Sequence, residues 1–293
     1  LPADGRFTLK TTTSAPYETR IVVRRPKADA DFNGTAVVEW LNVSSGADVA
    51  PDWTYMAEEI VRSGYAWVGV SAQRIGVEGG PVLVETPASD QLGAGKGIKH
   101  LDPARYGALH HPGDAYSYDL YTQVARALRF DGASNPLHGL RVRRLLAVGE
   151  SQSAITLTTY ADGVQPLTRA FDGFLIHSRA GAAAPLGEPG KGIDLATSLS
   201  NQVARIRTDL DVPVLTVETE SDVLGLLGFV RARQPDSARF RLWEIAGTAH
   251  ADTYQLGAAV DLVDCGEPIN DGQQVFVLRA ALHALGAWVA RGV

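Results

Sequence analysis

The chain has 293 residues, of which 45% are hydrophobic, and a formal net charge of −6 at pH 7. This length and composition predict a large hydrophobic core within one domain spanning 1–293. The negative charge argues against nucleic acid or an anionic membrane as the partner, because both require a basic surface, and no apolar run approaches the ~18 residues of a membrane span.

The first third of the chain predicts strands before the first long helix. Segments 6–10 and 17–24 have the composition and alternation of antiparallel strands that would open the fold. The apolar run 35–41 predicts a buried strand. Apolar residues at helical spacing then predict a helix over 52–63, and another apolar run predicts a strand over 65–71.

Strands and helices continue to alternate in the rest of the chain. The patterns predict helices over 115–130, 200–209 and 276–290, and strands over 141–148, 171–177, 212–217 and 240–245. Three aromatic residues of the first of these helices, Tyr118, Tyr121 and Phe130, are expected in the core. Such alternation is typical of the α/β class, with a mainly parallel sheet covered by helices on both faces.

Two segments, at about 73–114 and 178–197, are too long for ordinary connections. We expect both to be loop insertions that shape a binding site, the second as a small lid or pocket wall. His177 and Arg179, at the base of the second insertion, are candidates for substrate contact. An ordinary salt bridge at a strand end is the alternative for these two side chains.

The sequence GESQS at 149–153 joins a predicted strand to a predicted helix. This order is typical of a nucleophile elbow, G-x-S-x-G, in which the central serine lies on a sharp, strained turn. Gly149 and Ser153 are small enough for that turn, although Ser153 departs from the usual glycine. Ser151 is therefore the candidate nucleophile, and capping of the following helix is the alternative reading.

A serine nucleophile needs a histidine base and a carboxylate that orients the base. Three acids, Glu218, Glu220 and Asp222, follow one predicted strand, and His250 follows the next. Parallel strands end at the same edge of a sheet, so these side chains are expected near Ser151. Asp222 matches the position of the acid in many α/β-hydrolases, Glu220 is the alternative, and a surface role is the alternative for His250.

An oxyanion hole requires two N–H donors beside the nucleophile. The first expected donor is the backbone N–H of Gln152, at the start of the helix that follows Ser151. The second usually comes from the loop after an earlier strand, here 42–46, where Val43 is the candidate and Asn42 the alternative. No HGGG sequence is present, so a simple polar turn is the other reading of this loop.

Several segments together resemble the poorly characterised alpha/beta hydrolase domain family of bacterial and fungal proteins. These segments are EWLNVSSG (39–46), GYAWVGVSAQ (64–73), GESQS (149–153), VETESD (217–222) and RLWEIAGTAHAD (241–252). The resemblance covers nearly the whole chain and implies the α/β-hydrolase fold and hydrolysis of carboxylic esters. It implies Ser151 as nucleophile, His250 as base and an acid within 218–222, and it brings no settled substrate.

The sequence predicts neither a metal nor a cofactor. Cys265 is the only cysteine, which excludes an internal disulfide and a cysteine-based zinc site. His110 and His111 are poorly spaced as metal ligands, and the glycines between 76 and 97 lack the strand and helix of a phosphate loop. The chain begins at Leu1 without a visible signal-peptide core, so cytoplasmic and secreted locations both stay open, as does the oligomeric state.

These patterns predict a serine esterase that acts through an acyl-enzyme on a small-molecule ester. The same triad could cleave a thioester, lactone or amide, or transfer the acyl group to an alcohol. A different class of function is a non-catalytic hydrolase-fold binding protein. That alternative predicts a missing triad member or a collapsed pocket, and an intact set of residue types can still lie apart in space.

Overall fold

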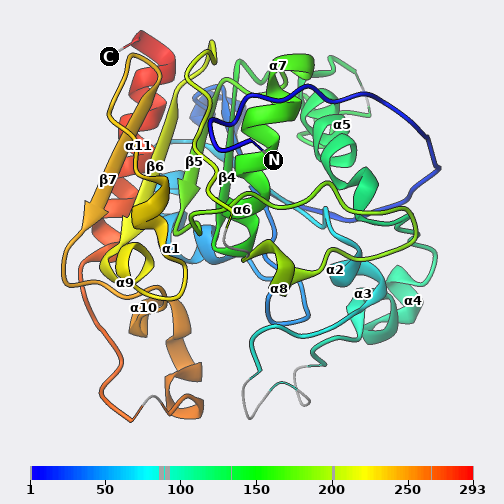
Figure 1. Cartoon of the computed structure of the whole chain (residues 1–293). Helices are drawn as coiled ribbons and strands as arrows, with labels where there is room; N and C mark the ends of the chain where they lie inside the picture. The colour runs from blue at the N-terminus through cyan, green and yellow to red at the C-terminus, as the bar shows by residue number, and fades with distance from the viewer. Residues whose placement is uncertain are drawn as a thin grey trace.

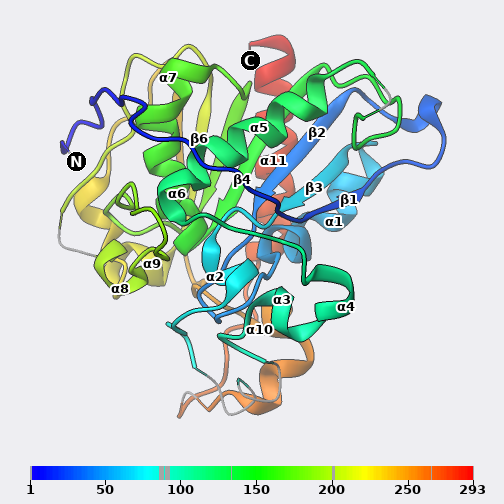
Figure 2. The same ribbon diagram turned by 90° about the vertical axis from the view of Figure 1, so that its right-hand side faces the viewer.

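The computed structural model describes residues 2–85, 89, 93–132, 134–199, 202–264 and 266–292. Its centre is a seven-stranded sheet with the order β1-β3-β2-β4-β5-β6-β7 (Figures 1 and 2). The strands are β1 (Ile21–Arg24), β2 (Thr35–Trp40), β3 (Ala66–Val70), β4 (Arg144–Glu150), β5 (Gly173–His177), β6 (Val214–Thr219) and β7 (Phe240–Ile245). Only β1 is antiparallel, pairing with β3, and the other neighbours in the sheet are parallel. The predicted α/β class is confirmed.

The main helices cover both faces of this sheet (Figure 2). α5 (Ser117–Arg129) and α6 (Gln152–Thr159) pack on one face, and α1 (Pro51–Arg62) and α11 (Gln274–Arg291) pack on the other. Successive residues of a strand point to opposite faces, so Leu145 joins the α5–α6 layer and Leu146 the α1–α11 layer. This double burial explains why the central strands are almost continuously apolar.

The remaining helical segments are short and lie in the connections. They are η1 (Asp29–Asp31), α2 (Arg74–Glu78), α3 (Gly97–Leu101), α4 (Pro103–Tyr106), η2 (Asp114–Tyr116), η3 (Tyr160–Val164), α7 (Gln165–Thr168), α8 (Leu195–Ser198), α9 (Glu220–Leu224), η4 (Phe229–Ala232), α10 (Thr253–Leu256) and η5 (Gly257–Leu262). Among the described residues, no helix combines the length and apolar character needed to cross a membrane.

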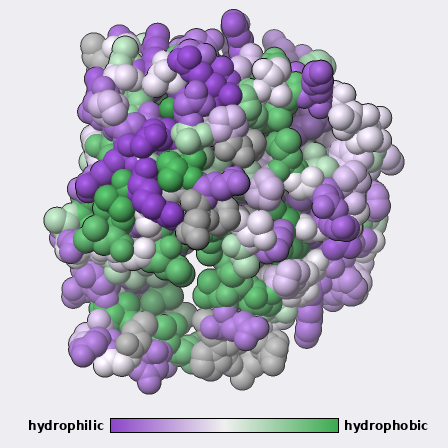
Figure 3. Space-filling view, viewed as in Figure 1, coloured by the Kyte–Doolittle hydropathy of each residue, from purple (hydrophilic) through white to green (hydrophobic). Residues whose placement is uncertain are grey.

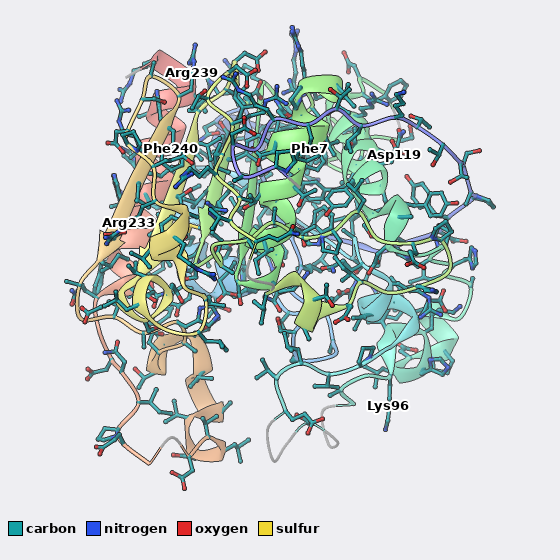
Figure 4. All side chains as sticks on the ribbon, in the orientation of Figure 1. Phe7, Lys96, Asp119, Arg233, Arg239 and Phe240 are labelled. Carbon is teal, nitrogen blue, oxygen red and sulfur yellow. The ribbon has the colours of Figure 1, made fainter. Side chains whose placement is uncertain are left out.

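Two predicted elements are wrong because tertiary contacts replace local ones. Residues 6–10 form no strand; Phe7 lies against Gly163 of η3, where an added Cβ would come 2.3 Å from the Phe7 ring (Figure 4). The described part of the predicted helix 200–209 is not helical. There, the N–H groups of Arg205 and Arg207 donate to Ala3 O and Asp162 Oδ1, in distant segments, rather than to the preceding turn.

One predicted core residue is also misplaced. Tyr118 and Tyr121 are buried and lie next to Trp40, with ring centroids 5.6 and 4.9 Å away. Phe130 is 57% exposed, because α5 ends at Arg129 and the chain turns to extended backbone at Phe130 itself. The helical stripe therefore stops before its last aromatic residue.

The two insertions are joined to each other through Asp114. Asp114 Oδ1 accepts the N–H of Arg74 at 2.7 Å, in the first insertion, and Oδ2 accepts the N–H of Ile193 at 2.5 Å, in the second. The Asp114 N–H in turn donates to Lys191 O at 2.9 Å. A single buried carboxylate therefore holds both insertions together beside the carboxyl ends of the strands.

Candidate active site

Three side chains from three strand ends form one hydrogen-bonded chain. Ser151 follows β4, Asp222 lies on α9 after β6, and His250 follows β7. His250 Nε2 is 2.9 Å from Ser151 Oγ, and His250 Nδ1 is 2.6 Å from Asp222 Oδ1. Residues separated by up to 99 positions in the sequence thus meet at one edge of the sheet.

Ser151 adopts the strained backbone that a nucleophile elbow requires. Its φ is 58° and its ψ is −119°, a conformation that a non-glycine residue rarely adopts. The turn is held by a 2.9 Å hydrogen bond from Ser151 N to His177 O. A Cβ on Gly149 would lie 2.9 Å from the Leu157 side chain and 3.1 Å from Ser153 Cβ, so the turn needs glycine at 149.

Asp222 is the acid that contacts the histidine, and the other two acids have different partners. Asp222 Oδ2 accepts the N–H and the hydroxyl of Thr219 at 3.0 and 2.6 Å, an N-terminal capping box that fixes the carboxylate. Glu220 accepts the N–H of Gly247 at 2.8 Å. Glu218 is buried and accepts the N–H of Arg179 at 3.3 Å.

The α9 segment also holds the loop that carries His250. Ser221 Oγ accepts the His250 N–H at 2.8 Å, and Glu220 holds Gly247 as described above. On the other side, Asp252 Oδ1 accepts the hydroxyl of Tyr55, from α1, at 2.9 Å. The position of the imidazole is therefore set by backbone and side-chain contacts on both sides of the loop.

Neighbouring groups shift the pKa values of His250 and Asp222 in this hydrogen-bonded triad. Burial alone would lower the pKa of His250, but the hydrogen bond to Asp222 and the charges of Glu150 and Asp222 raise it to about 9. Burial would raise the pKa of Asp222, but the hydrogen bond and charge of His250 and the hydrogen bond from Thr219 lower it below its usual value. An ionised Asp222 beside an imidazole that holds its proton strongly is the electrostatic result.

The two predicted N–H donors lie next to each other in the fold. Gln152 begins α6, so its N–H precedes the intrahelical hydrogen bonds, and its side-chain Oε1 lies 3.5 Å from the Val43 N–H. The alternative donor, Asn42, uses its N–H in a 2.9 Å bond to Val49 O. The geometry therefore favours Val43 over Asn42 as the second donor.

The alpha/beta hydrolase domain family matches residues 1–293. The chain belongs to this family. Comparison with curated protein sequences finds no match.

Several solved structures of serine hydrolases and esterases are similar to this chain, all at low sequence identity. A serine hydrolase without a lid from Xanthomonas campestris is 11% identical, with 95% of this chain and 96% of that chain covered and a TM-score of 0.44. One of two fungal esterases from Rhizomucor miehei is 12% identical, with 95% and 85% covered and a TM-score of 0.48. Est1E from Butyrivibrio proteoclasticus, solved with ferulic acid, is 11% identical, with 94% and 97% covered and a TM-score of 0.44. Similarities with such low identities and TM-scores do not indicate the substrate of this alpha/beta hydrolase.

Glu150 is a site residue of this hydrolase that the sequence reasoning did not single out. Its buried carboxylate lies 3.5 Å from His250 Nε2, the nitrogen that faces Ser151. Asn42 Nδ2 donates both to Glu150 O at 3.0 Å and to Glu150 Oε2 at 3.3 Å, which holds the side chain in place. The sequence did offer one indication of this role. Glu150 directly precedes the elbow serine and is the last residue of β4, so its side chain was placed near the site.

The predicted substrate-contact residues are turned into the hydrolase core. His177 and Arg179 are both 0% exposed. His177 Nδ1 lies 3.0 Å from Asp52 Oδ1, and Arg179 donates to Ala204 O at 3.0 Å and packs over the Phe229 ring. Both side chains are therefore buried with protein partners, and their contact with substrate stays a prediction.

The structure describes one of the histidines considered as a metal ligand in a buried position with protein partners. His111 is buried, with Nε2 2.9 Å from Ala72 O and Nδ1 accepting the Gly113 N–H at 3.2 Å. No cluster of histidine, cysteine and acidic side chains suited to a metal is found among the described residues. Cys265 lies outside the described residues.

Proposed function

We propose that this protein is a serine hydrolase that cleaves carboxylic esters through an acyl-enzyme. The observation that carries the proposal is the unbroken chain from Asp222 through His250 to Ser151, at 2.6 and 2.9 Å. A non-catalytic binding protein needs no such alignment. The strained φ of 58° at Ser151 also supports a catalytic role, because strain is retained where function requires it.

The proposed reaction begins when neutral His250 holds its proton on Nδ1, toward Asp222. Ser151 Oγ forms a bond to the ester carbonyl carbon while its proton passes to His250 Nε2. The oxyanion accepts the N–H groups of Gln152 and Val43, which requires Gln152 Oε1 to yield its 3.5 Å contact with Val43 N. The ester C–O bond then breaks and the alcohol leaves with the proton from Nε2.

Water completes the cycle by the same route. His250 accepts a proton from water as the water oxygen attacks the acyl-enzyme, and the returning proton restores Ser151 as the acid product leaves. Asp222 stabilises the imidazolium in both steps without taking its proton, which agrees with its lowered pKa.

A fluorophosphonate that labels activated serines tests the proposal directly. We expect one adduct per chain by intact mass, located on Ser151 by peptide mapping. Ser151→Ala should abolish the adduct and His250→Ala should slow its formation by about a hundredfold or more, because the serine loses its base. Ser237→Ala is the control, since Ser237 precedes β7 and so lies at the opposite edge of the sheet from His250. Absence of labelling in folded protein would contradict the hydrolase function.

A further inference from the structure

A hollow with apolar walls opens on the side of the molecule where the parallel strands end. Figure 3 shows it at the lower edge of the view, with hydrophobic surface on both sides. In the same orientation, Figure 1 places α10–η5 on one side and the segment after α2 on the other. Because the elbow lies at this edge of the sheet, the hollow leads toward the proposed site.

One wall is hydrogen-bonded to the proposed oxyanion loop. The N–H groups of Leu83 and Val84 both donate to Ser44 O, at 2.9 Å, and Ser44 directly follows Val43. The side chains of Leu83 and Val84 are 37% and 53% exposed. Two adjacent apolar side chains are therefore presented to solvent beside a loop whose backbone is fixed.

The other wall follows the histidine loop. α10 begins three residues after His250, and Tyr254 and Leu262 of α10–η5 are 42% and 44% exposed. Near Asp222, Leu224 and Leu226 are 72% and 89% exposed. Single exposed apolar residues are ordinary, but these lie on the segments that follow Asp222 and His250, where they are available to an apolar molecule.

A buried apolar cluster lies behind this surface, beside the nucleophile. Val43 and Ile155 belong to one hydrophobic cluster, which also contains Ile75, Ala180, Ala184 and Ile193 and is flanked by Leu199 and Leu227. Ile155 lies four residues after Ser151, one turn along α6, and its N–H donates to Ser151 O. Aliphatic side chains thus lie next to both the serine and the proposed oxyanion loop.

The charges around the site disfavour an anionic substrate. Glu150 and Asp222 place two carboxylates within 3.5 Å of the imidazole. The guanidinium of Arg179 is fully buried and donates to Ala204 O. Lys96, on the same side of the molecule, points outward (Figure 4). A negatively charged acyl chain would therefore meet repulsion near the reacting centre.

We propose that the substrate is an uncharged ester with an extended apolar acyl chain, which lies in the hollow between 81–85 and α10–η5. This inference rests on the esterase function proposed above. The acyl carbon must lie between Ser151 and the Val43 N–H, so the chain attached to that carbon starts beside the cluster of Val43 and Ile155. From there the two apolar walls lead it toward solvent.

Matched p-nitrophenyl esters test the substrate class. We expect kcat/KM for the octanoate to exceed that for the acetate by tenfold or more, because the longer chain gains apolar contact in the hollow. The mono-ester of octanedioate, of equal length but ending in a carboxylate, should fall at least tenfold below the octanoate. All three are compared below their solubility limits, and the octanoate is also assayed above its limit. Preference for acetate, equal use of the charged ester, or activity only above the solubility limit would each overturn the inference, the last by indicating a lipid surface.

Variants of the two walls locate the chain. Leu83→Ser combined with Val84→Ser, and separately Leu262→Ser, should each lower the octanoate-to-acetate ratio at least threefold, because the octanoate loses apolar contacts that the acetate does not reach. Leu167→Ser is the matched control, since Leu167 is 59% exposed on α7, far from the hollow. Wall variants that keep the parental ratio would contradict the placement. A parent that is not labelled would instead contradict the esterase function itself, so the two failures are distinguishable.

Discussion

At the scale of single residues, Asp222 and Glu220 lie two positions apart in the sequence but have different hydrogen-bond partners. Asp222 faces the imidazole, whereas Glu220 accepts a backbone N–H from Gly247 in the histidine loop. The reason is local, because the capping box of α9 turns Asp222 inward at its third helical residue while Glu220 starts the helix.

This difference predicts unequal effects of two conservative changes. Asp222→Asn should lower kcat by about a thousandfold or more, since an amide cannot stabilise the imidazolium and favours the wrong tautomer. Glu220→Gln keeps an oxygen for Gly247 and should cost less than about tenfold. Steady-state kinetics of the two variants on one ester measures both effects. A reversed ranking would move the acid to Glu220.

His250 predicts the pH dependence of activity. The raised pKa of about 9 means that the imidazole is mostly protonated at pH 7 and cannot act as a base in that form. We therefore expect kcat/KM to rise with pH through neutrality and level off above about pH 9. A profile that is already flat from pH 6 would contradict the raised pKa.

Glu150 contributes to that pKa through its charge beside Nε2. Glu150→Gln removes the charge but keeps the hydrogen-bonding groups near Asn42, so the acidic limb of the kcat/KM profile should move to lower pH. Burial raises the pKa of Glu150 itself and the charges of His250 and His177 oppose that rise, so the shift reports how far Glu150 is ionised. Glu220→Gln, which changes a carboxylate that does not face Nε2, should leave the limb in place. Identical limbs in the parent and Glu150→Gln would show that Glu150 carries no charge there.

At the scale of elements, α1 reaches across the edge of the sheet to the histidine loop. Tyr55 is fully buried, its hydroxyl donates to Asp252 Oδ1 at 2.9 Å, and its ring lies edge-on to His177 with centroids 5.6 Å apart. Asp252 also caps α10 by accepting the Gln255 N–H at 2.9 Å. The last residue of the GTAHAD segment therefore anchors the loop rather than taking part in the reaction.

Removal of this anchor should affect turnover more than binding. Tyr55→Phe keeps the ring but deletes the hydroxyl, leaving Asp252 without one partner, and we expect kcat to fall several-fold with KM little changed, because His250 is less well held. Tyr254→Phe is the control, since Tyr254 stacks on the same ring and its hydroxyl accepts a hydrogen bond from the partly exposed Arg279 at 2.7 Å. Equal kcat values for the parent and Tyr55→Phe would remove α1 from the positioning of the loop.

At the scale of the whole molecule, Asp162 links folding to pH. It is buried on η3, where Oδ1 accepts the Arg207 N–H at 2.9 Å and Oδ2 has no hydrogen-bond partner among the described residues. Burial raises its pKa to about 8, against the hydrogen bond from Arg207 and the charges of Arg179 and Arg207. The folded state then holds a proton that the unfolded state, with a pKa of about 3.9, releases.

The sign of this linkage gives a stability prediction. Between about pH 4 and 8 the folded state binds more protons at Asp162 than the unfolded state, so this contribution to stability is lost as pH rises through that window. Asp162→Asn should therefore have a free energy of unfolding that falls less from pH 5 to pH 8.5 than that of the parent. Urea denaturation at both pH values measures the difference. Parallel pH dependence in the two proteins would show that Asp162 does not titrate in this range.

The sequence by itself determined the α/β class, the seven strands after residue 17 within a few residues, and the candidates Ser151, Asp222 and His250. These follow from local signals: apolar runs long enough for buried strands, small residues at a sharp turn, and polar side chains directly after strands. The catalytic roles stay predictions that the proposed measurements address, and the single domain spanning 1–293 stays a prediction from length and composition.

Only the tertiary structure decided the features that depend on distant partners. Segments 6–10 and 202–209 bond to other parts of the chain instead of forming a strand and a helix, and His177 and Arg179 turn inward to buried partners. Glu150 gains its place beside His250 only because β4 and β7 end at the same edge of the sheet. Such contacts join residues many positions apart, and no local pattern in the sequence records which distant group a side chain will meet.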